Sequence, residues 1–354
     1  MREDGLTVLI TGTGGGGVGE QCMGALRLSK IRYRIIATDM KPMTLGLFLA
    51  DKSYIVPSAS DPNYVERLLN ICENENVKVI IPGSEPELMK ISDERKKFEE
   101  KGIVVLVNDQ DVIKICQDKW RTYNFLKDNG FKVPRSYLPK NDDFLSHDLR
   151  FPVIIKPHVG GGGSKNLFLA QNDEELVFFV KYLRKLGVSP MVQEYVGSDD
   201  EEYTVGVLSD REGEILGSIA VKRIVEGALS RRFAIREHKG NRIFVVSTGV
   251  SQGLVGEYKN VRKNAEGIAE RLGSRGPINI QCRLTEDGVY TFEINPRFSG
   301  TTSIRALCGF NEPDTLIRKY VLGEKIREIT FKKGLVLRGL KNYYISPTDY
   351  ESLK

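Results

Sequence analysis

Short apolar runs alternate with amphipathic stretches along the first third of the chain. The apolar runs are rich in β-branched residues and predict strands at 7–11, 33–38, 77–82 and 103–107. The stretches between them carry apolar residues at helical spacing and predict helices at 19–29, 62–75 and 85–101. Strands that alternate with helices in this way form βαβ units around a parallel sheet. We therefore expect a parallel α/β domain at residues 1–113.

The pattern changes after residue 113. It predicts a helix at 119–129, strands at 151–158, 167–170 and 191–196, and a helix at 173–186. Polar and apolar residues then alternate in longer runs, which predict strands at 202–210, 214–224, 278–284 and 289–295, with one helix at 256–272. Such alternation is typical of a largely antiparallel sheet. The predicted fold class is α/β followed by α+β, with the second domain at residues 114–354.

Length and composition agree with this division. A chain of 354 residues is long enough for two or three packed units. Its 52 basic and 47 acidic side chains leave a net charge of only +5 without any dense block of Lys and Arg, which argues against nucleic-acid binding. No apolar stretch is long enough to span a membrane, and the start, MREDGLTVLITG, lacks the basic region of a signal peptide. We expect a cytoplasmic protein with neither a nucleic-acid nor a membrane partner.

The cysteines and histidines form no recognisable metal or disulfide pattern. The five cysteines show no CxxC spacing and the three histidines lie far apart, so zinc and a disulfide framework are both disfavoured. We expect the cysteines to be buried free thiols.

A glycine cluster follows the first predicted strand. Residues 12–17 fit the pattern GxGxxG between a strand and a helix, and Asp39 ends the next strand. This arrangement is found where NAD binds, with the acid on a ribose. The alternative is a tight structural turn, because runs of glycine satisfy many such patterns.

The segment INIQCRLTEDGVYTFEINPR (278–297) predicts a hairpin. A three-residue loop, Glu286-Asp287-Gly288, would place apolar side chains on one face and polar ones on the other. The expected apolar pairs are Ile280 with Ile294, Cys282 with Phe292, and Leu284 with Tyr290. The expected polar pairs are Asn279 with Asn295, Gln281 with Glu293, and Arg283 with Thr291.

This polar face predicts a metal site. Gln281, Glu293 and Asn295 offer carboxylate and amide oxygens, which suit Mg²⁺, and Arg297 lies just beyond them. The alternative is an ordinary solvated sheet face, although such strands rarely run into an Asn-Pro-Arg turn.

Lysines and arginines provide further candidates. Lys156 lies inside an apolar strand, where an unpaired ammonium group is costly, and a glycine run at 160–163 with Ser164 and Lys165 follows it. The alternative for Lys156 is a side chain that extends to solvent, and Lys119 by itself reads as a surface lysine. An Arg-rich segment offers guanidinium groups for a substrate carboxylate, the alternative being a solvated basic loop; its arginines are Arg223, Arg231, Arg232 and Arg236.

Taken together, these motifs resemble the ATP-grasp superfamily, closest to the synthetase units of the carbamoyl-phosphate synthetase large subunit and to stand-alone carboxylate–amine ligases. The similarity covers nearly the whole chain. VLITGTGGG, ATD and IIPGSEPEL resemble the preATP-grasp domain, which would make the first glycine cluster a substrate or structural loop. DKWRTYNFLKDNGFKVPRSY, FPVIIKP and HVGGGGSK resemble the phosphate-binding segments and the mobile lid, with the lid subdomain at about 150–192.

The resemblance also implies roles for single residues. Lys119 and Lys156 would contact ATP phosphates, and the lid loop would cover them with Gly161, Gly162, Gly163 and Ser164. The backbone of a hinge would bind adenine, with Glu194 as the adenine-side acid; the hinge residues are Gln193, Glu194, Tyr195 and Val196. Glu202 would hold the ribose. Gln281, Glu293 and Asn295 would bind Mg²⁺, and Arg297 would contact the transferring phosphate.

The resemblance implies an ATP-dependent ligase that uses Mg²⁺, or Mn²⁺ in its place. It would activate a small carboxylate as an acyl phosphate for attack by an amine or a thiol, and a homodimer is compatible with this family. The chain has one synthetase unit, so complete carbamoyl-phosphate synthesis is not expected. The alternatives are a kinase-like or carbamoyl-phosphate-synthetase-like phosphoryl-transfer subunit with a partner, a non-catalytic nucleotide-binding module, and an NAD-dependent oxidoreductase.

Overall fold

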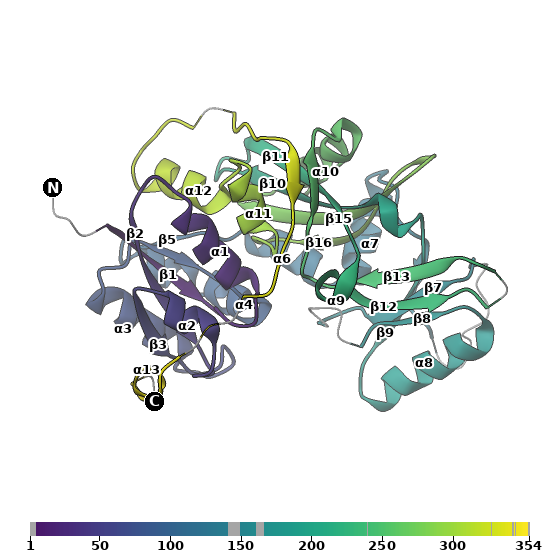
Figure 1. The fold of residues 1–354 in the computed structure, drawn as a ribbon, viewed down its shortest axis with the longest axis horizontal. Coiled ribbons are helices and arrows are strands. Elements are labelled where there is room, and N and C mark those ends of the chain that lie inside the picture. The colour runs from purple at the N-terminus through teal and green to yellow at the C-terminus, as the bar shows by residue number, and fades with distance from the viewer. Residues whose placement is uncertain are drawn as a thin grey trace.

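The chain folds into a first unit built on one sheet and a larger second part that carries three more sheets among the described residues (Figure 1). The computed structural model describes residues 5–140, 149–160, 166–238, 240–326, 328–341, 343 and 345–352. The predicted fold class is confirmed, because a parallel α/β unit precedes an α+β part with antiparallel sheets. The boundary at residue 113 and the bounds of the lid subdomain stay predictions.

The first unit is a five-stranded parallel sheet with the strand order β3-β2-β1-β4-β5. Its strands are Leu6–Thr11 (β1), Tyr33–Asp39 (β2), Lys52–Ile55 (β3), Val79–Ile81 (β4) and Val104–Val105 (β5). Its helices are Val18–Arg27 (α1), Leu45–Leu49 (α2), Tyr64–Asn74 (α3), Glu85–Asp93 (α4) and Arg95–Glu99 (α5). All four predicted strands are present. The short elements α2 and β3 were not predicted, and the expected helix at 85–101 is divided into α4 and α5.

Apolar side chains cover both faces of this sheet, as is usual for parallel strands. Val8 and Ile10 of β1 belong to a core cluster that includes α1 and continues into the second part of the molecule at Phe298 and Phe310. Leu9 points to the opposite face and joins a cluster with α3, α4 and α5. The first of these clusters joins the two parts of the chain.

A six-stranded antiparallel sheet forms the centre of the second part, in the order β16-β15-β10-β11-β14-β17. Its strands are Glu202–Ser209 (β10), Ile215–Arg223 (β11), Gly253–Gly256 (β14), Pro277–Thr285 (β15), Gly288–Asn295 (β16) and Gly334–Val336 (β17). Helix α10 (Lys259–Leu272) packs on one face through Val261, Ala265 and Ile268. The opposite face of β10, β15 and β16 is free to line a site.

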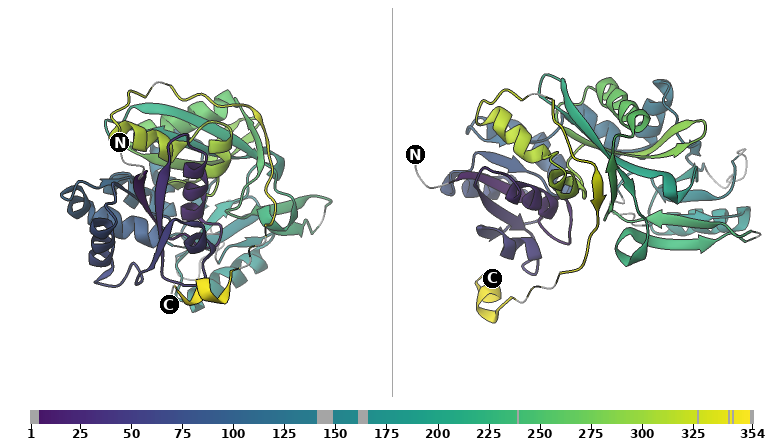
Figure 2. Two further views of the ribbon diagram at one scale, coloured as in Figure 1. Left: turned by 60° about the vertical axis from the view of Figure 1, so that its left-hand side comes forward. Right: turned by 45° about the horizontal axis from the view of Figure 1, so that its top comes forward.

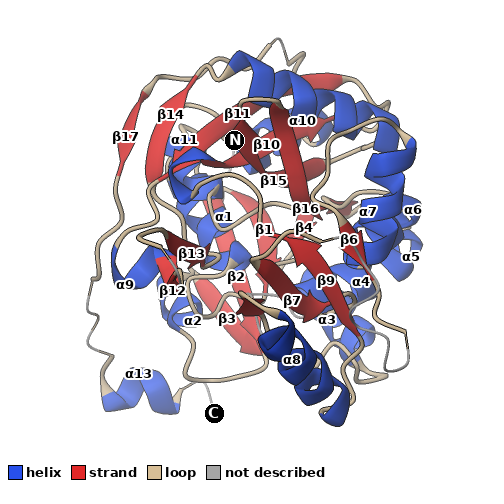
Figure 3. Cartoon of the chain, turned by 90° about the vertical axis from the view of Figure 1, so that its right-hand side faces the viewer, coloured by secondary structure: helices blue, strands red, loops and turns tan. Residues whose placement is uncertain are grey.

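Two smaller sheets stand beside the six-stranded one (Figure 3). The four-stranded antiparallel sheet has the order β6-β9-β7-β8 and is covered by helix α8 (Asp173–Lys185). Its strands are Ser136–Tyr137 (β6), Val153–Pro157 (β7), Phe168–Ala170 (β8) and Pro190–Glu194 (β9). The two-stranded sheet is Arg231–Arg236 (β12) with Ile243–Ser247 (β13). Gln171 Nε2 donates to the carbonyl oxygen of Arg236 at 2.9 Å, which holds β12 to the four-stranded sheet.

Short helices and the C-terminal segment complete the chain. The remaining helices of the described residues are Gln110–Gln117 (α6), Lys119–Asp128 (α7), Asp199–Glu201 (η2), Gly227–Ser230 (α9), Thr302–Leu307 (α11), Glu312–Tyr320 (α12) and Pro347–Glu351 (α13). Beyond β17 the chain passes back to the first unit, where Arg338 Nη2 donates to Gln21 Oε1 of α1 at 2.7 Å (Figure 2). Within the described ranges, no helix has the length and apolar character needed to cross a membrane. All five cysteines are buried and free, as predicted.

Candidate active site

A cleft of about 390 Å³ lies where the first unit, the six-stranded sheet and the two smaller sheets meet. Most of the predicted site residues line it, although they come from segments far apart in the sequence. These residues are Lys119, Lys156, Gln193, Glu194, Tyr195, Val196, Glu202, Arg223, Gln281, Glu293, Asn295 and Arg297. A cleft of this size with a few convergent polar groups is typical of a small-molecule site.

Some predicted residues are not brought to the cleft. Arg231, Arg232 and Arg236 lie on β12 and are exposed, and none of them lines the cleft. The predicted lid residues Gly161, Gly162, Gly163 and Ser164 lie outside the described residues.

The hairpin of β15 and β16 carries the predicted metal face. Asn279 pairs with Asn295, and Gln281 pairs with Glu293, as predicted. Ile280 pairs with Ile294, also as predicted. The three predicted pairs nearer the turn are wrong, because Phe292 is the extra residue of a β-bulge: Cys282 pairs with Thr291, Arg283 with Tyr290, and Leu284 with Val289. The turn has two residues between Thr285 and Gly288, where we expected three. The bulge lets the successive residues Phe292 and Glu293 both face the cleft.

The three oxygen-bearing side chains of this face fit a hard cation. Gln281 and Glu293 make no side-chain hydrogen bond or ion pair to the described residues, so their oxygens are available to a ligand. Oδ1 of Asn295 accepts from Nη2 of Arg297 at 3.2 Å. The described residues contain no cluster of three His, Cys, Asp or Glu side chains that could hold a metal. One carboxylate and two amides therefore suit Mg²⁺ whose remaining ligands are phosphate oxygens and water.

Two lysines enter the cleft from the side of the four-stranded sheet. Lys156 is buried on β7, and its Nζ donates to Oε1 of Gln193 at 2.8 Å. Burial, and to a lesser extent the charge of Lys119, lower the pKa of Lys156 to about 8, although Glu293 opposes the shift. Lys119 is placed by the start of α7, where the Asp118 side chain caps the helix by accepting from two backbone amides. Two positive charges thus face Glu293 across the cleft.

The hinge (residues 193–196) is braced from β15. The guanidinium of Arg283 lies over the Tyr195 ring, 4.2 Å from its centroid, and its Nη1 donates to the carbonyl oxygen of Val196 at 3.0 Å. The Tyr195 hydroxyl donates to the carbonyl oxygen of Val245 at 3.0 Å. The backbone amide of Val196 has no hydrogen-bond partner in the described part of the chain. The hinge therefore presents an unused donor on a rigid support.

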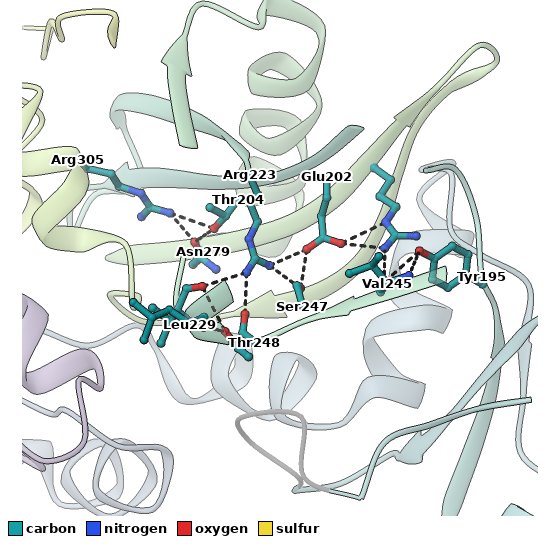
Figure 4. Close-up of polar contacts among 12 residues, drawn as sticks. Tyr195, Glu202, Thr204, Arg223, Leu229, Val245, Ser247, Thr248, Asn279 and Arg305 are labelled. Atoms are coloured by element: carbon teal, nitrogen blue, oxygen red, sulfur yellow. Dashed lines mark hydrogen bonds and ion pairs between the residues drawn. The ribbon is translucent and has the colours of Figure 1, made fainter. Parts of the chain in front are cut away.

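Glu202 is the centre of a buried network of charges (Figure 4). Its Oε1 accepts from Nη1 of Arg223 at 2.6 Å and from Oγ of Ser247 at 2.7 Å, and its Oε2 accepts from Nη2 of Arg283 at 2.9 Å. Burial would raise the pKa of Glu202, but Arg223 and Arg283 hold it below the ordinary value. Protein donors thus occupy both carboxylate oxygens. The ribose role of Glu202 and the substrate role of Arg223 stay predictions.

Several residues of the site were not predicted from the sequence. Glu85, at the start of α4, accepts from Nη2 of Arg297 at 3.0 Å and connects the first unit to the metal hairpin. Arg283 could have been found, because it lies two residues from Gln281 on the same face of β15. Ser247 and Glu85 carry no such signal, since only the tertiary fold brings them to the cleft.

The first glycine cluster also borders the cleft, through residues 15–18. Gly15 and Gly16 have φ values of +65° and +71°, which side-chain-bearing residues rarely adopt. Asp39 is buried beneath the loop, and a Cβ at Gly14 would lie only 3.2 Å from Asp39 Oδ2. Asp39, which the NAD interpretation needs at a ribose, is thus little exposed in this structure.

The chain is similar to known families over most of its length. A model described as the ATP-grasp domain matches residues 116–301, and one described as the PylC-like, N-terminal domain matches residues 8–106. The D-alanine--D-alanine ligase of Fusobacterium nucleatum is 34% identical over 181 residues, which are 51% of this chain and 56% of that protein. The carbamoyl phosphate synthase arginine-specific large chain of Halalkalibacterium halodurans is 26% identical over 338 residues, 93% of this chain but 29% of that protein.

A solved structure shares the fold. The biotin carboxylase domain dimer of the Hydrogenobacter thermophilus 2-oxoglutarate carboxylase, in complex with MgADP, ADP and bicarbonate, matches with a TM-score of 0.59. The match is 18% identical and covers 93% of this chain and 73% of that one. The chain thus spans about half of one of the two curated relatives and less than a third of the other.

Proposed function

Because the chain belongs to the ATP-grasp family, whose domain model matches residues 116–301, we propose that it is an ATP-dependent ligase. It joins a small-molecule carboxylate to an amine, or to a thiol, and the carboxylate is first activated as an acyl phosphate. A second copy of the chain as partner and a cytoplasmic location remain predictions from the sequence.

One observation carries this proposal. The cleft holds, side by side, a hinge with an unused backbone donor, two lysines, three oxygen ligands and an arginine. In this arrangement the Val196 amide binds the adenine edge, and Lys119 and Lys156 bind phosphate oxygens. Gln281, Glu293 and Asn295 would hold Mg²⁺, which neutralises phosphate charge when bound.

Three positive side chains and one carboxylate of the cleft have defined tasks in the transfer. Lys119, Lys156 and Arg297 offset the charge that builds up as the γ-phosphoryl group leaves ADP for a carboxylate oxygen. Glu85 orients Arg297 through their 3.0 Å ion pair. No His and no Cys from the described ranges lines the cleft, so a covalent enzyme adduct has no support there.

The acceptor enters from the side of the first unit. Residues 15–18 follow β1 and Glu85 follows β4, and these two strands are neighbours at the point where the strand order of the sheet reverses. Ligands of open parallel sheets bind at such a point, outside the carboxyl ends of the strands. The carboxylate and the amine would therefore meet the γ-phosphate between the glycine loop and Arg297.

A comparison of nucleotides tests the ATP-dependent function. Mg·ATP should raise the thermal midpoint of the protein, because a ligand at 100 times its Kd adds about 2.7 kcal/mol to the free energy of unfolding. NAD at the same concentration should leave the midpoint unchanged. A shift with NAD and none with Mg·ATP would support the oxidoreductase instead. A screen for ADP release across amino acids and dicarboxylates then identifies the substrates.

A further inference from the structure

A buried ion pair behind the cleft holds one more polar side chain in place. Arg305 of α11 and Glu312 of α12 are both fully buried, and Nη1 of Arg305 lies 3.1 Å from Oε1 of Glu312. Nη2 of the same guanidinium donates to Oδ1 of Asn279, which also accepts from Oγ1 of Thr204 at 2.7 Å. Figure 4 shows Arg305, Thr204 and Asn279 in this contact.

These contacts decide which end of the Asn279 amide faces the cleft. A guanidinium group only donates hydrogen bonds, so the Asn279 atom beside Arg305 must be the carbonyl oxygen. The amide nitrogen then points away from Arg305, and Asn279 lines the cleft. Asn279 thus offers a donor to the cleft, beside residues that offer oxygens.

Gly206 of β10 provides the room for this arrangement. It is the cross-strand partner of Asn279 on β15. A Cβ at Gly206 would lie 2.2 Å from Nη1 and 2.6 Å from Cζ of Arg305. Any side chain at this position would displace the guanidinium that fixes the Asn279 amide.

The position of Asn279 along β15 indicates its ligand. Arg283, Gln281 and Asn279 alternate along the strand and share one face, with successive members about 7 Å apart. Arg283 supports the hinge at one end. Asn279 lies at the other end, paired with Asn295, whose Oδ1 accepts from Arg297. A nucleotide with its adenine at the hinge would bring its last phosphate to this end.

We propose that Asn279 donates a hydrogen bond to the γ-phosphate of bound ATP, and that Arg305 is the positioning residue that keeps its amide in this orientation. The proposal rests on the ATP-dependent function proposed above. The Asn279 amide would be a neutral hydrogen-bond donor beside the positive and metal-binding groups of the cleft. It would contact only the γ-phosphate, which ADP lacks.

Calorimetric binding of two nucleotides tests this role without knowledge of the substrates. The probes are Mg·ADP and the magnesium complex of the ATP analogue with an imido bridge between its β- and γ-phosphates. Asn279→Asp keeps an oxygen for Arg305 and Thr204 but replaces the donor with a negative oxygen. The Kd of the analogue should rise at least about tenfold, and that of Mg·ADP less than about twofold. Asn279→Ala, which adds no charge, should act in the same direction.

A second pair of variants tests the positioning by Arg305. Gly206→Ala should weaken the binding of the analogue but not that of Mg·ADP, because the new methyl group displaces Arg305 without entering the cleft. The matched control is Gly334→Ala on β17, where a Cβ meets no atom within 4 Å, and it should bind both nucleotides like the wild type. If Gly206→Ala does not fold, the two Asn279 variants decide the matter.

The outcomes separate this inference from the proposed function. An unchanged ratio of the two Kd values in folded Asn279→Asp and Asn279→Ala proteins overturns the γ-phosphate contact. If both nucleotides bind these variants equally more weakly, the γ-phosphate contact is also overturned, because the effect would then be merely structural. A wild-type protein that binds neither nucleotide contradicts the proposed function instead.

Discussion

Turnover by the variant Glu293→Gln is expected to fall by at least about 10³-fold, while the protein stays folded. Glu293 is the one carboxylate among the three proposed metal ligands, and it also faces the two lysines of the cleft. A glutamine keeps the shape of the side chain but removes its negative charge. The site would then lack its one anionic ligand for Mg²⁺, and with it the metal that neutralises the phosphates. Since Glu293 makes no ion pair or hydrogen bond within the described residues, little folding energy depends on it.

Steady-state ADP release and a thermal melt without ligand check this expectation together. The midpoint of unfolding should move by less than about 2 °C, because the change lies on a face without core packing. The control is Glu286→Gln, the same substitution at the exposed turn of the same hairpin, which should keep wild-type turnover. Wild-type turnover of Glu293→Gln at ordinary Mg²⁺ concentrations would exclude the metal role.

Nucleotide affinity is expected to fall as the pH rises through about 8, because Lys156 then loses its charge. The pKa of a buried lysine lies below its ordinary value, so the ammonium form is complete only below that pH. Phosphate binding requires this form, and the Kd of Mg·ATP should therefore rise up to about tenfold per pH unit above the pKa of the free protein. Bound phosphates raise the pKa of Lys156, so the lysine of the complex stays charged to a higher pH. The Kd of Mg·ATP stops rising once the pH exceeds this higher pKa.

Two lysine variants distinguish this cause from a general effect of pH. Lys156→Met should bind Mg·ATP weakly at every pH and lose the dependence near pH 8. Lys119→Met should also bind weakly but keep a dependence, with its midpoint at a higher pH, because Lys119 lowers the pKa of Lys156. Calorimetry between pH 6.5 and 9.5, a range of about 1.5 units on either side of the pKa, measures all three proteins. An unchanged pH dependence in Lys156→Met would assign the titration to another group.

The metal face could be predicted because its evidence is local. Strand alternation and the Asn-Pro-Arg turn place Gln281, Glu293 and Asn295 on one face of a hairpin, and the structure keeps the pairing of Gln281 with Glu293. The bulge at Phe292 could not be predicted in this way. Alternation predicts that successive residues face opposite sides of a strand, whereas here Phe292 and Glu293 both face the cleft while Val289 and Thr291 are buried on the other side.

The ion pairs of Glu202 with two arginines could not be predicted, for a different reason. Arg223 and Arg283 lie 21 and 81 residues away along the chain, and only the pairing of β10 with β11 and with β15 brings them together. The short strands β3 and β17 were missed because edge strands of three or four residues carry too little alternation to detect. The long strands and helices could be predicted because the spacing of their apolar residues repeats over several helical turns or several pairs of strand residues.

Trapping with hydroxylamine tests the acyl phosphate most directly. With a carboxylate that stimulates ADP release, the γ-phosphoryl group moves from ATP to a carboxylate oxygen and ADP is left. Hydroxylamine then attacks the acyl carbon and displaces phosphate, which yields a hydroxamate. We expect hydroxamate, ADP and phosphate in equal amounts, with none of the three in Glu293→Gln. AMP and pyrophosphate would indicate an acyl adenylate, and ADP without hydroxamate for every stimulating carboxylate would indicate a kinase-like transfer; either result would contradict the proposed ligase.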